Sequence, residues 1–410
     1  MNEYVIIGNS TAAVGCIEGI RSKDKEGKIT VISKENHKVY GRPLISYYLQ
    51  KKTDLEKMNY RKESFYEDNN VELLLGVSAE KIDTEKKMVI TDTKGEIPYT
   101  SVCVATGSNP FVPPFEGLES VEKKFSFMTL DDALELEKAI DETSRVLIVG
   151  AGLIGLKCAE GIKDRVASIT VCDLADRVLS SILDSECAAV IQKRLEENGI
   201  AFLLGDSATK FDGKKAFMKS GKEVDFDVLV LAIGVRANIS LVKDAGGETD
   251  RGIVINTKSE TSVKDVYAAG DCAQGFDSST GSSRVLAILP NAYMQGHTAG
   301  VNMAGGEETL DNAIPMNSIG FFGVHIMTAG RYDGEMKEEK GEGYLKRFFV
   351  EDGKLIGFII IGQTERAGIY TSLIREKTSL ESIDFDLLSK VATTVAFSKE
   401  SRGKKFGGVV

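Results

Sequence analysis

The chain has 410 residues, a length typical of two or three domains, and 42% of them are hydrophobic, which is enough to form real cores. With 51 Lys and Arg against 61 Asp and Glu, the formal net charge of −10 disfavours nucleic acids and anionic membranes as partners. The longest apolar or glycine stretch, 146–156, is shorter than the roughly 20 residues that cross a bilayer. The first residues show no basic region or cleavage site of a signal peptide, so we expect a cytoplasmic protein.

The cysteines and histidines are poorly spaced for metal binding. The nearest two of the six cysteines, Cys158 and Cys172, are fourteen positions apart, and none of the three histidines has a partner at a spacing that puts both on one helix face. The chain therefore lacks the Cys-x-x-Cys pairs of zinc and cluster sites, and we expect no metal ion. Each cysteine is predicted to be a small buried apolar residue.

The first 35 residues have the order of a dinucleotide-binding fold. An apolar strand at 4–7 leads into a small-residue turn and a helix, and a second strand at 29–33 ends close to Glu35. Gly8 occupies the tight turn, Ser10 takes the usual place of the second glycine, and Ala13 takes that of the third. Ser10 puts a hydroxyl group beside the expected phosphate, where it can donate a hydrogen bond. The segment predicts a dinucleotide site with a degenerate fingerprint.

A complete fingerprint lies 142 residues further along the chain. After the strand at 145–149, Gly150 serves the tight turn, Gly152 the close approach of backbone to pyrophosphate, and Gly155 the packing of helix on strand. Asp173 follows Gly155 by eighteen residues, at the end of a second strand, where a carboxylate accepts hydrogen bonds from a ribose. We therefore expect two dinucleotide folds in one chain.

Three more apolar strands end in or near glycine, at 102–107, 228–234 and 266–271. Because the carboxyl end of a buried parallel strand meets a ligand or a domain crossover, these ends are expected to lie at the nucleotide sites. From about residue 312 the pattern changes to short alternating strands, with helical periodicity following over 363–389. The clearest of these strands are 344–350 and 355–361, joined by a turn at 351–354. A third, α+β unit is predicted there, ending in a polar tail.

Taken together, these motifs resemble, in kind and order, the two-dinucleotide-fold flavoprotein reductases over roughly residues 4–305, and within them the rubredoxin-reductase and nitrite-reductase-like branch. The resemblance implies an α/β protein with two Rossmann-like dinucleotide-binding domains in a glutathione-reductase-like architecture, plus a C-terminal α+β domain. It implies an FAD-binding domain in two parts, 1–110 and 238–310, with an NAD(H)-binding domain, 111–237, inserted between them. Residues 311–410 would form the C-terminal interface domain with its polar tail.

The same resemblance implies which residues line the two cofactor sites. Glu35 would bind the adenosine ribose of FAD, Asp271 would accept a hydrogen bond from the ribityl chain, and a helix starting near residue 290 would face the flavin pyrimidine edge. The residues expected to contact FAD are Gly8, Ser10, Ala13, Glu35, Arg42, Pro43, Ala105, Thr106, Gly107, Gly270, Asp271, Asn291 and Ala292, with Arg42 and Pro43 beside the flavin. The residues expected to contact NAD(H) are Gly150, Gly152, Ile154, Gly155, Asp173, Ala232 and Gly234.

Two positions depart from the pattern of these relatives. The relatives often carry a lysine after the Arg-Pro segment and a glutamate just after the NAD-site glycines, as an ion pair close to flavin and nicotinamide. Here those positions hold Tyr47 and Lys157. We therefore hypothesise that Lys157 brings the positive charge to the flavin N5 edge, with Tyr47 nearby, the alternative being a helix lysine whose ammonium group reaches solvent.

The electron acceptor is the open question, because flavin takes hydride from NADH and can release electrons singly. The segment 37–46, where disulfide reductases and single-cysteine oxidases of this superfamily carry their redox thiol, contains no cysteine. The resemblance implies FAD and NADH as cofactors, and because no thiol relay is present we expect a one-electron carrier protein of the rubredoxin or ferredoxin type as acceptor. Such carriers are usually acidic, so docking requires a local basic surface. Unless they are only solvated helix faces, the candidates are Lys51, Lys52, Lys57, Arg61 and Lys62, and in the tail Arg402, Lys404 and Lys405.

Two other functions are left open. The chain could be the electron-entry subunit of a larger iron–sulfur or metal-containing oxidoreductase, which would make it part of a hetero-oligomer, or it could be an NADH oxidase that reduces oxygen. In each case NADH is expected as donor in preference to NADPH, because the Asp173 carboxylate would repel a 2′-phosphate, and the next three residues carry no cation. The alternative for Asp173 is that it only caps the segment that follows.

Overall fold

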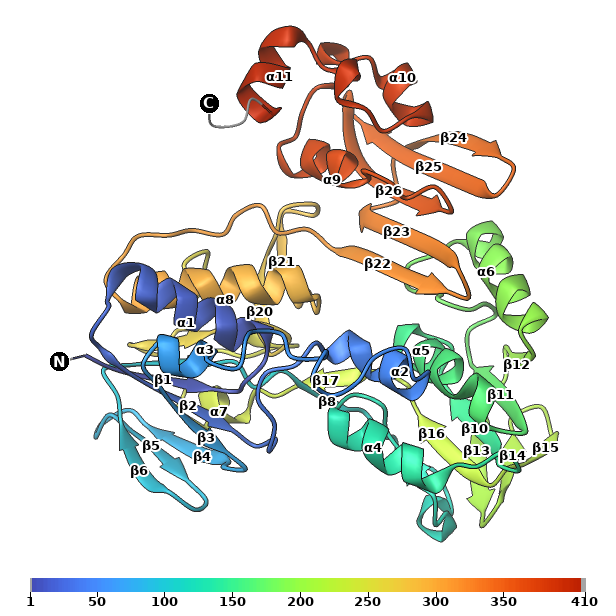
Figure 1. The fold of residues 1–410 in the computed structure, drawn as a ribbon, viewed down its shortest axis with the longest axis horizontal. Helices are drawn as coiled ribbons and strands as arrows, with labels where there is room; N and C mark the ends of the chain where they lie inside the picture. The colour runs from blue at the N-terminus through green and yellow to red at the C-terminus, as the bar shows by residue number, and fades with distance from the viewer. Residues whose placement is uncertain (1, 407–410) are drawn as a thin grey trace.

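The computed structural model describes residues 2–406, and its chain forms three units, two of which are built on parallel sheets (Figure 1). The first sheet has the order β19-β7-β1-β2-β3, and each neighbouring pair is parallel. Its central strands are continuous apolar runs because both faces of the sheet are covered. The strands are β1 (Glu3–Ile7), β2 (Lys28–Ser33), β3 (Val71–Leu75), β7 (Ser101–Val104) and β19 (Val266–Ala268).

Smaller elements of the first unit were not predicted from the sequence. They include an antiparallel meander and a second small sheet, whose strands are too short to give a clear alternating pattern. These elements are β4 (Ala79–Asp83), β5 (Met88–Thr91), β6 (Gly95–Pro98), β18 (Ile253–Val254), β20 (Ala273–Asp277) and β21 (Ser282–Arg284), with the short helices α3 (Phe65–Asp68) and α7 (Ser240–Asp244).

Helices α1 (Thr11–Lys23) and α8 (Leu289–Met303) of the first unit cross at backbone contact (Figure 1). A Cβ atom at Gly15 would lie 2.3 Å from the carbonyl oxygen of Tyr293, and one at Gly296 would lie 2.0 Å from the carbonyl oxygen of Ala12. Only residues without a side chain allow so close an approach. The helices run in the same direction at this crossing, so both N-terminal ends lie at the same edge of the sheet.

The second unit is a parallel sheet of the order β12-β11-β10-β16-β9. The chain enters it after β8 and leaves it at β17, and these two strands pair antiparallel, so the entry and the exit lie side by side. The elements are β8 (Ser108–Pro110), β9 (Lys124–Phe125), α4 (Leu130–Ala139), β10 (Arg145–Val149), α5 (Leu153–Ile162), β11 (Ser168–Asp173), α6 (Ser185–Glu197), β12 (Ile200–Leu204), β16 (Val228–Leu231) and β17 (Val235–Ala237), with a small sheet of β13 (Ala208–Asp212), β14 (Lys215–Met218) and β15 (Glu223–Asp225).

The third unit is an antiparallel sheet of the order β22-β23-β26-β25-β24 with helices beside it. The predicted strand pair is confirmed as β25 (Tyr344–Glu351) and β26 (Lys354–Ile361). Asp352 and Gly353 connect them with φ of 49° and 67°, as the two-residue turn of a twisted hairpin requires. The remaining strands are β22 (Met316–Phe321), β23 (Val324–Gly330) and β24 (Glu335–Gly341).

The helical periodicity predicted over 363–389 corresponds to two helices and not to one continuous helix. The structure splits it into α9 (Gly368–Arg375) and α10 (Phe385–Lys390), with a single 3-10 turn between them. The backbone of Lys377 turns left-handed, with φ of 51°, and ends α9. The side chain of Asp384 then accepts a hydrogen bond from Leu387 N at 2.9 Å and begins α10. The last described helix is α11 (Lys399–Phe406).

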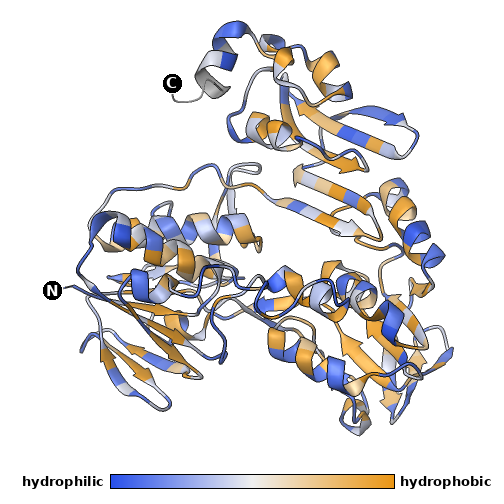
Figure 2. Cartoon of the chain, in the orientation of Figure 1, coloured by the Kyte–Doolittle hydropathy of each residue, from blue (hydrophilic) through white to orange (hydrophobic). Residues whose placement is uncertain are grey.

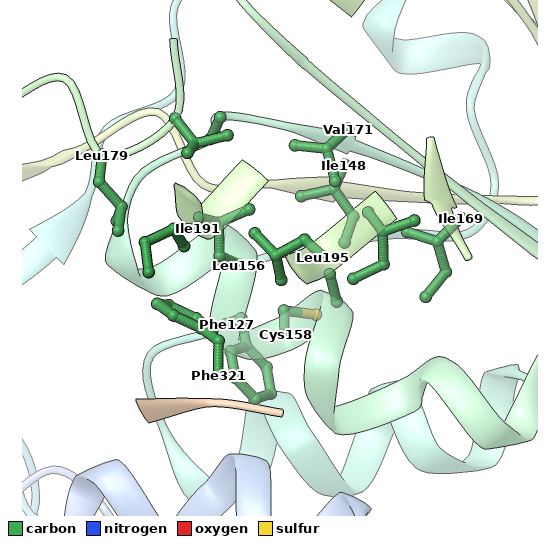
Figure 3. Close-up of a cluster of buried hydrophobic side chains, with 14 of the residues drawn as sticks. Phe127, Ile148, Leu156, Cys158, Ile169, Val171, Leu179, Ile191, Leu195 and Phe321 are labelled. Atoms are coloured by element: carbon green, nitrogen blue, oxygen red, sulfur yellow. The ribbon is translucent and has the colours of Figure 1, made fainter. Parts of the chain in front are cut away.

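One hydrophobic core joins the second unit to the third. Hydrophobic residues gather in the strands and on the inward faces of helices (Figure 2). In Figure 3 the ring of Phe321, from β22, lies beside Phe127 and Cys158 of the second unit. The same cluster includes residues of the short helix α2 (Ile45–Leu49) from the first unit, so all three units meet there. Within residues 2–406, no helix is both long and apolar enough to span a membrane.

Candidate active site

The first glycine-rich turn lies between the carboxyl end of β1 and the start of α1. Gly8 has a φ of +116°, and a Cβ atom there would lie 2.1 Å from the carbonyl oxygen of Ala105, so the turn admits only glycine. Ser10 is the N-cap of α1 but makes no capping hydrogen bond through its side chain, and the first turn of the helix has no acidic residue. The helix therefore presents N–H groups, the positive end of its dipole and the Ser10 hydroxyl to an anionic group. Ala13 is fully buried and fills the space between helix and sheet.

Glu35 and Arg42, which the family resemblance assigns to opposite halves of FAD, form an ion pair. The second oxygen of Glu35 accepts a hydrogen bond from the Tyr40 hydroxyl at 2.7 Å, and Arg42 also donates to the carbonyl oxygen of Met128 at 3.2 Å. Burial raises the pKa of Tyr40 well above its usual range, so its hydroxyl stays a donor. Tyr40 is a residue that the sequence analysis missed, although it lies two positions before Arg42.

The loop after β19 fits between the starts of α1 and α8. Gly270 has a φ of +81°, and its N–H donates to the side-chain oxygen of Gln295 at 2.9 Å. Asp271 follows, and burial raises the pKa of its carboxyl group, an effect that the nearby charge of Arg42 opposes. A partly buried carboxylate at this place fits a ligand that brings hydroxyl donors to it. Gln295 was not predicted, because nothing in its sequence context distinguishes it from a core polar residue.

The start of α8 carries an unsatisfied acceptor. Asn291 is 1% exposed, and its amide nitrogen donates to the carbonyl oxygen of Leu286 at 3.2 Å. Its side-chain oxygen has no hydrogen-bond partner. Buried polar atoms are normally paired, so this oxygen fits a cofactor that carries an N–H or O–H donor, as FAD does. Ala292, the next residue, is buried beside Gly270, where a Cβ atom on Gly270 would meet its methyl group at 3.6 Å.

The end of β7 is tied to the strand that returns from the second unit. Thr106 donates through its hydroxyl group to the carbonyl oxygen of Asn238 at 3.1 Å, and the Asn238 side chain donates to the carbonyl oxygen of Thr106 at 2.9 Å. The backbone N–H of Asn238 also donates to Gly107. Asn238 was missed by the sequence analysis. This exchange of hydrogen bonds ties Thr106 and Gly107, two of the predicted FAD-side residues, to the segment that follows β17.

The second glycine-rich turn repeats the geometry of the first. Gly150 also has a φ of +116°, and a Cβ atom there would lie 2.2 Å from the carbonyl oxygen of Ala232. A Cβ atom at Gly155 would lie 2.0 Å from the carbonyl oxygen of Gly150, whereas Gly152 faces open space. This geometry suits a tight turn at Gly150 and close helix packing at Gly155, and it leaves space beside Gly152, where the approach of a ligand stays a prediction. Ile154 lies on α5, and Gly234 lies between β16 and β17.

Asp173 lies beside this turn at the end of β11. One carboxylate oxygen accepts from Ala151 N at 2.7 Å and the other accepts from Ala175 N at 2.8 Å. The residue therefore does cap the following segment, and each oxygen keeps a further lone pair for a ribose hydroxyl group. Arg177, the nearest cation along the chain, donates to the carbonyl oxygen of Leu183 at 3.2 Å and pairs with Asp176 at 2.8 Å.

Lys157 lies where the three units meet, and its side chain is largely buried instead of extending into solvent. Its side chain is 14% exposed and pairs with Glu160, and its Nζ lies 3.2 Å from the carbonyl oxygen of Gly320. The Nζ also lies 4.7 Å from the centre of the Tyr47 ring. The structure thus brings together the two residues that the sequence singled out. Pro43 is the second residue of the 3-10 turn Arg42–Leu44 that leads into α2, and Tyr47 lies on that helix.

The cysteines offer no thiol to this site. All six side chains are 0% exposed, as was expected of small buried apolar residues. Burial raises the pKa of Cys272 to about 11 and that of Cys172 to about 12, so neither is a thiolate at neutral pH. Over the described part of the chain, no group of three or more histidine, cysteine or acidic side chains is arranged to hold a metal ion.

The expected basic surface is largely neutralised. Lys57 pairs with Asp54 at 2.8 Å, Lys62 with Asp68 at 2.5 Å, and Arg61 with Glu18 at 2.9 Å. Lys51 and Lys52 are exposed, and neither makes an ion pair with any residue between 2 and 406. In the tail, Arg402 is exposed, whereas the side chains of Lys404 and Lys405 lie outside the described residues.

Comparison with known proteins agrees with this architecture. Residues 2–296 match the pyridine nucleotide-disulphide oxidoreductase family, and residues 315–378 match the rubredoxin NAD+ reductase C-terminal domain. The chain is 30% identical over 392 residues to the epsilon subunit of the NADH-dependent phenylglyoxylate dehydrogenase of Aromatoleum evansii, with 92% of each chain covered. It is 31% identical over 418 residues to an NADH oxidase of Methanocaldococcus jannaschii, again with 92% of each covered.

A solved structure has the same fold over nearly the whole chain. The ferredoxin reductase of Rhodopseudomonas palustris superposes with a TM-score of 0.86 at 23% identity, covering 92% of this chain and 96% of that one. The fold class and the family resemblance read from the motifs are thus confirmed. The chain belongs to the pyridine nucleotide-disulphide oxidoreductase family and is an oxidoreductase that uses FAD and NAD(H).

Proposed function

We propose that the chain takes hydride from NADH and passes the electrons to a one-electron carrier protein of the rubredoxin or ferredoxin type. The observation that carries this proposal is the absence of a thiol relay: 37–46 has no cysteine, and all six cysteines are fully buried. Bound FAD supplies the conversion between a two-electron donor and a one-electron acceptor. The matches to a rubredoxin NAD+ reductase C-terminal domain and to a ferredoxin reductase support an acceptor of this kind.

In this proposal FAD occupies the first glycine-rich turn. The start of α1 and Ser10 bind its phosphates, Asp271 accepts from its hydroxyl groups, and the start of α8 with Asn291 provides the remaining contacts. Arg42 pairs with Glu35, and its charge also acts on Asp271, which favours a place near the phosphates. The FAD-binding domain would comprise 1–110 and 238–310.

NAD(H) occupies the second glycine-rich turn in the inserted domain, 111–237. The start of α5 faces its pyrophosphate, and Asp173 reads the ribose hydroxyl groups. Lys157, in the second turn of α5, is the cation that we place at the flavin edge, because Tyr47 beside it belongs to the short helix that follows Arg42 and Pro43. A cation there favours the anionic form of reduced flavin.

The docking surface for an acidic carrier would include Lys51 and Lys52, which follow α2. Among the cations predicted near this segment, these two are exposed and make no ion pair within residues 2–406, so their charge is available to a partner. The C-terminal interface domain, 311–410, would provide the rest of the surface.

The test is an acceptor comparison with the FAD-loaded chain. NADH should drive fast reduction of a viologen dye and of added rubredoxin or ferredoxin, with slow turnover on oxygen. Fast oxygen reduction with no carrier reduction would contradict the proposal in favour of an NADH oxidase. The carrier-free reaction with dye serves as the control for an intact flavin and NADH site.

A second candidate is an electron-entry subunit of a larger oxidoreductase. The similarity to the epsilon subunit of a dehydrogenase, over 92% of both chains, favours it. A subunit of this kind would reduce dye but neither free rubredoxin nor free ferredoxin, and a metal-containing partner would co-purify with the tagged chain from its native host. Isolation of the chain alone, together with rapid carrier reduction, would exclude this candidate.

A further inference from the structure

Glu160 connects Lys157 to the third unit. It lies on α5, three residues after Lys157, and its side chain is 7% exposed. One of its carboxylate oxygens pairs with the Lys157 ammonium group. The other accepts a hydrogen bond from the backbone N–H of Phe322 at 2.8 Å. A single buried carboxylate thus holds both the ammonium group and the turn between β22 and β23.

That turn is held from both sides by charged residues of the second unit. Phe322 has a left-handed backbone, with φ of 45°, which is an uncommon conformation for a residue of its size. Its carbonyl oxygen accepts two hydrogen bonds from Arg194 of α6, at 2.9 and 2.7 Å, while Glu160 accepts from its N–H. The contacts from opposite sides explain how the strained turn is maintained.

The same turn completes the surroundings of Lys157. The carbonyl oxygen of Gly320 accepts from the ammonium group, and the ring of Phe321, which is fully buried, lies 5.5 Å from it. With Tyr47 on the side of α2, the ammonium group is enclosed by residues from all three units. A buried cation persists only if it is paired and hydrogen-bonded, and here the pairing carboxylate is Glu160.

We propose that Glu160 is a positioning residue that acts on the flavin through Lys157, and that it couples the charge at the flavin edge to the β22–β23 turn of the third unit. This inference rests on the proposed place of Lys157 beside the flavin. Glu160 fixes the ammonium group between Tyr47 and Gly320 and offsets part of its charge. A movement of the third unit at Phe322 would therefore change the field that the flavin experiences.

The test is a double-mutant cycle on the flavin midpoint potential of the FAD-loaded chain, with Lys157→Met, Glu160→Gln and the double variant. Lys157→Met should lower the potential, because reduced flavin loses a stabilising cation. Glu160→Gln should raise it, because the cation loses its partner. A tenfold change in the reduction equilibrium is expected for each, which is about 30 mV for a two-electron couple. In the Lys157→Met background, Glu160→Gln should change nothing.

The two levels of the proposal fail in different ways. An unchanged potential in Lys157→Met overturns the place of Lys157 beside the flavin. If Lys157→Met shifts the potential but Glu160→Gln has the same effect in both backgrounds, Lys157 keeps its role and the inference about Glu160 is wrong. Carrier reduction is measured separately and depends on neither result.

Two further variants separate positioning from general damage. Arg194→Gln removes the hydrogen bonds to the carbonyl oxygen of Phe322, and it changes a side chain that is more exposed than that of Glu160. This variant should raise the flavin midpoint potential only when Lys157 is present. Glu137→Gln is the matched control, since Glu137 also pairs with a cation of the second unit, Arg165, at 2.9 Å, and accepts from Tyr48 of α2 at 2.8 Å. A shift in Glu137→Gln equal to that in Glu160→Gln would overturn the inference.

Discussion

Gly300 of α8 faces the carbonyl oxygen of Cys16 of α1 so closely that a Cβ atom would lie 2.1 Å from it. The contact is backbone to backbone, so no side chain can move aside to make room. It lies one helical turn beyond the contact between Gly296 and Ala12, which is next to the FAD-side ends of both helices. The distance between these helices therefore sets the relative position of the two N-termini that we assign to FAD.

Gly300→Ala should consequently destabilise the chain, by about 1–3 kcal/mol, as overpacking does in a rigid core. FAD affinity should fall as well, because the two helix ends move apart. The measurements are urea denaturation and FAD titration by fluorescence. Gly368→Ala on α9 is the matched control, because no heavy atom lies within 4 Å of its Cβ position and its φ is not positive. Equal effects of the two substitutions would show that the crossing is not tightly packed.

The raised pKa of Asp271 predicts that the stability of the FAD-free protein depends on pH. Burial raises the pKa of its carboxyl group in the folded chain, so the folded state binds a proton more readily than the unfolded state does. Ionisation of Asp271 therefore lowers the free energy of unfolding. This destabilisation is absent below the pKa of Asp271 in the unfolded chain, about 3.9, and grows as the pH rises through its pKa in the folded chain. Asp271→Asn should therefore make the apoprotein more stable than the parent at pH 7, with the difference disappearing in acid. Denaturation curves of both proteins across this range check it.

The same carboxylate should be essential for holding FAD. Asp271→Ala removes a charged acceptor, which costs about 1.5–3 kcal/mol, equivalent to a roughly 10- to 150-fold loss of affinity. The loss is measured as release of flavin during dialysis, followed by its absorption. Asp277→Ala would be an unsuitable control because Asp277 is fully buried and pairs with Arg284. Asp265→Asn is preferable, since Asp265 is partly exposed and pairs with Lys87. Full flavin occupancy in Asp271→Ala would contradict the assigned role.

We expect the chain to prefer NADH strongly over NADPH as the hydride donor. The Asp173 carboxylate would face a 2′-phosphate of like charge, and Arg177 is already engaged by Leu183 and Asp176. Together the lost hydrogen bond and the repulsion should exceed about 2 kcal/mol, hence at least roughly 30-fold in kcat/KM. Dye reduction with each nucleotide measures the ratio. Asp173→Ala should reduce the ratio of kcat/KM for NADH to that for NADPH. An unchanged ratio would show that this carboxylate does not bind the ribose hydroxyl groups.

Carrier reduction should respond to the unpaired lysines. In the double variant Lys51→Gln, Lys52→Gln, KM for an acidic ferredoxin should rise several-fold while NADH-driven dye reduction stays unchanged, because an exposed charge acts mainly on encounter. The rise should diminish at high salt. Lys57→Gln with Lys62→Gln alters the net charge equally but removes lysines already paired with Asp54 and Asp68, and it should have a smaller effect. An equal rise in KM in the two double variants would show that only the net charge of the chain affects ferredoxin binding.

The duplicated dinucleotide fold was predictable because its signals are local. Gly8 and Gly150 both stand after an apolar strand, and each must adopt a φ of +116° against the carbonyl oxygen of a neighbouring strand, a constraint that only glycine meets. The β25–β26 hairpin was predictable for a similar reason, since Asp352 and Gly353 suit a turn with two positive φ angles. The lack of a redox thiol also follows from the sequence, because it concerns which residues are present.

Contacts between distant segments were decided only by the tertiary structure. The sequence could place Lys157 on a helix but could not tell a solvent-reaching lysine from a buried one. Whether Lys157 is buried depends on Gly320, which lies 163 positions away and accepts a hydrogen bond from its ammonium group. It depends also on Glu160, because the ammonium group needs a charged partner only once the third unit covers it. Likewise, no local pattern shows that Arg42 reaches Glu35, or that Lys57 and Lys62 are neutralised while Lys51 and Lys52 are not. Backbone constraints act over a few residues, whereas burial and charge pairing depend on what the rest of the chain brings alongside.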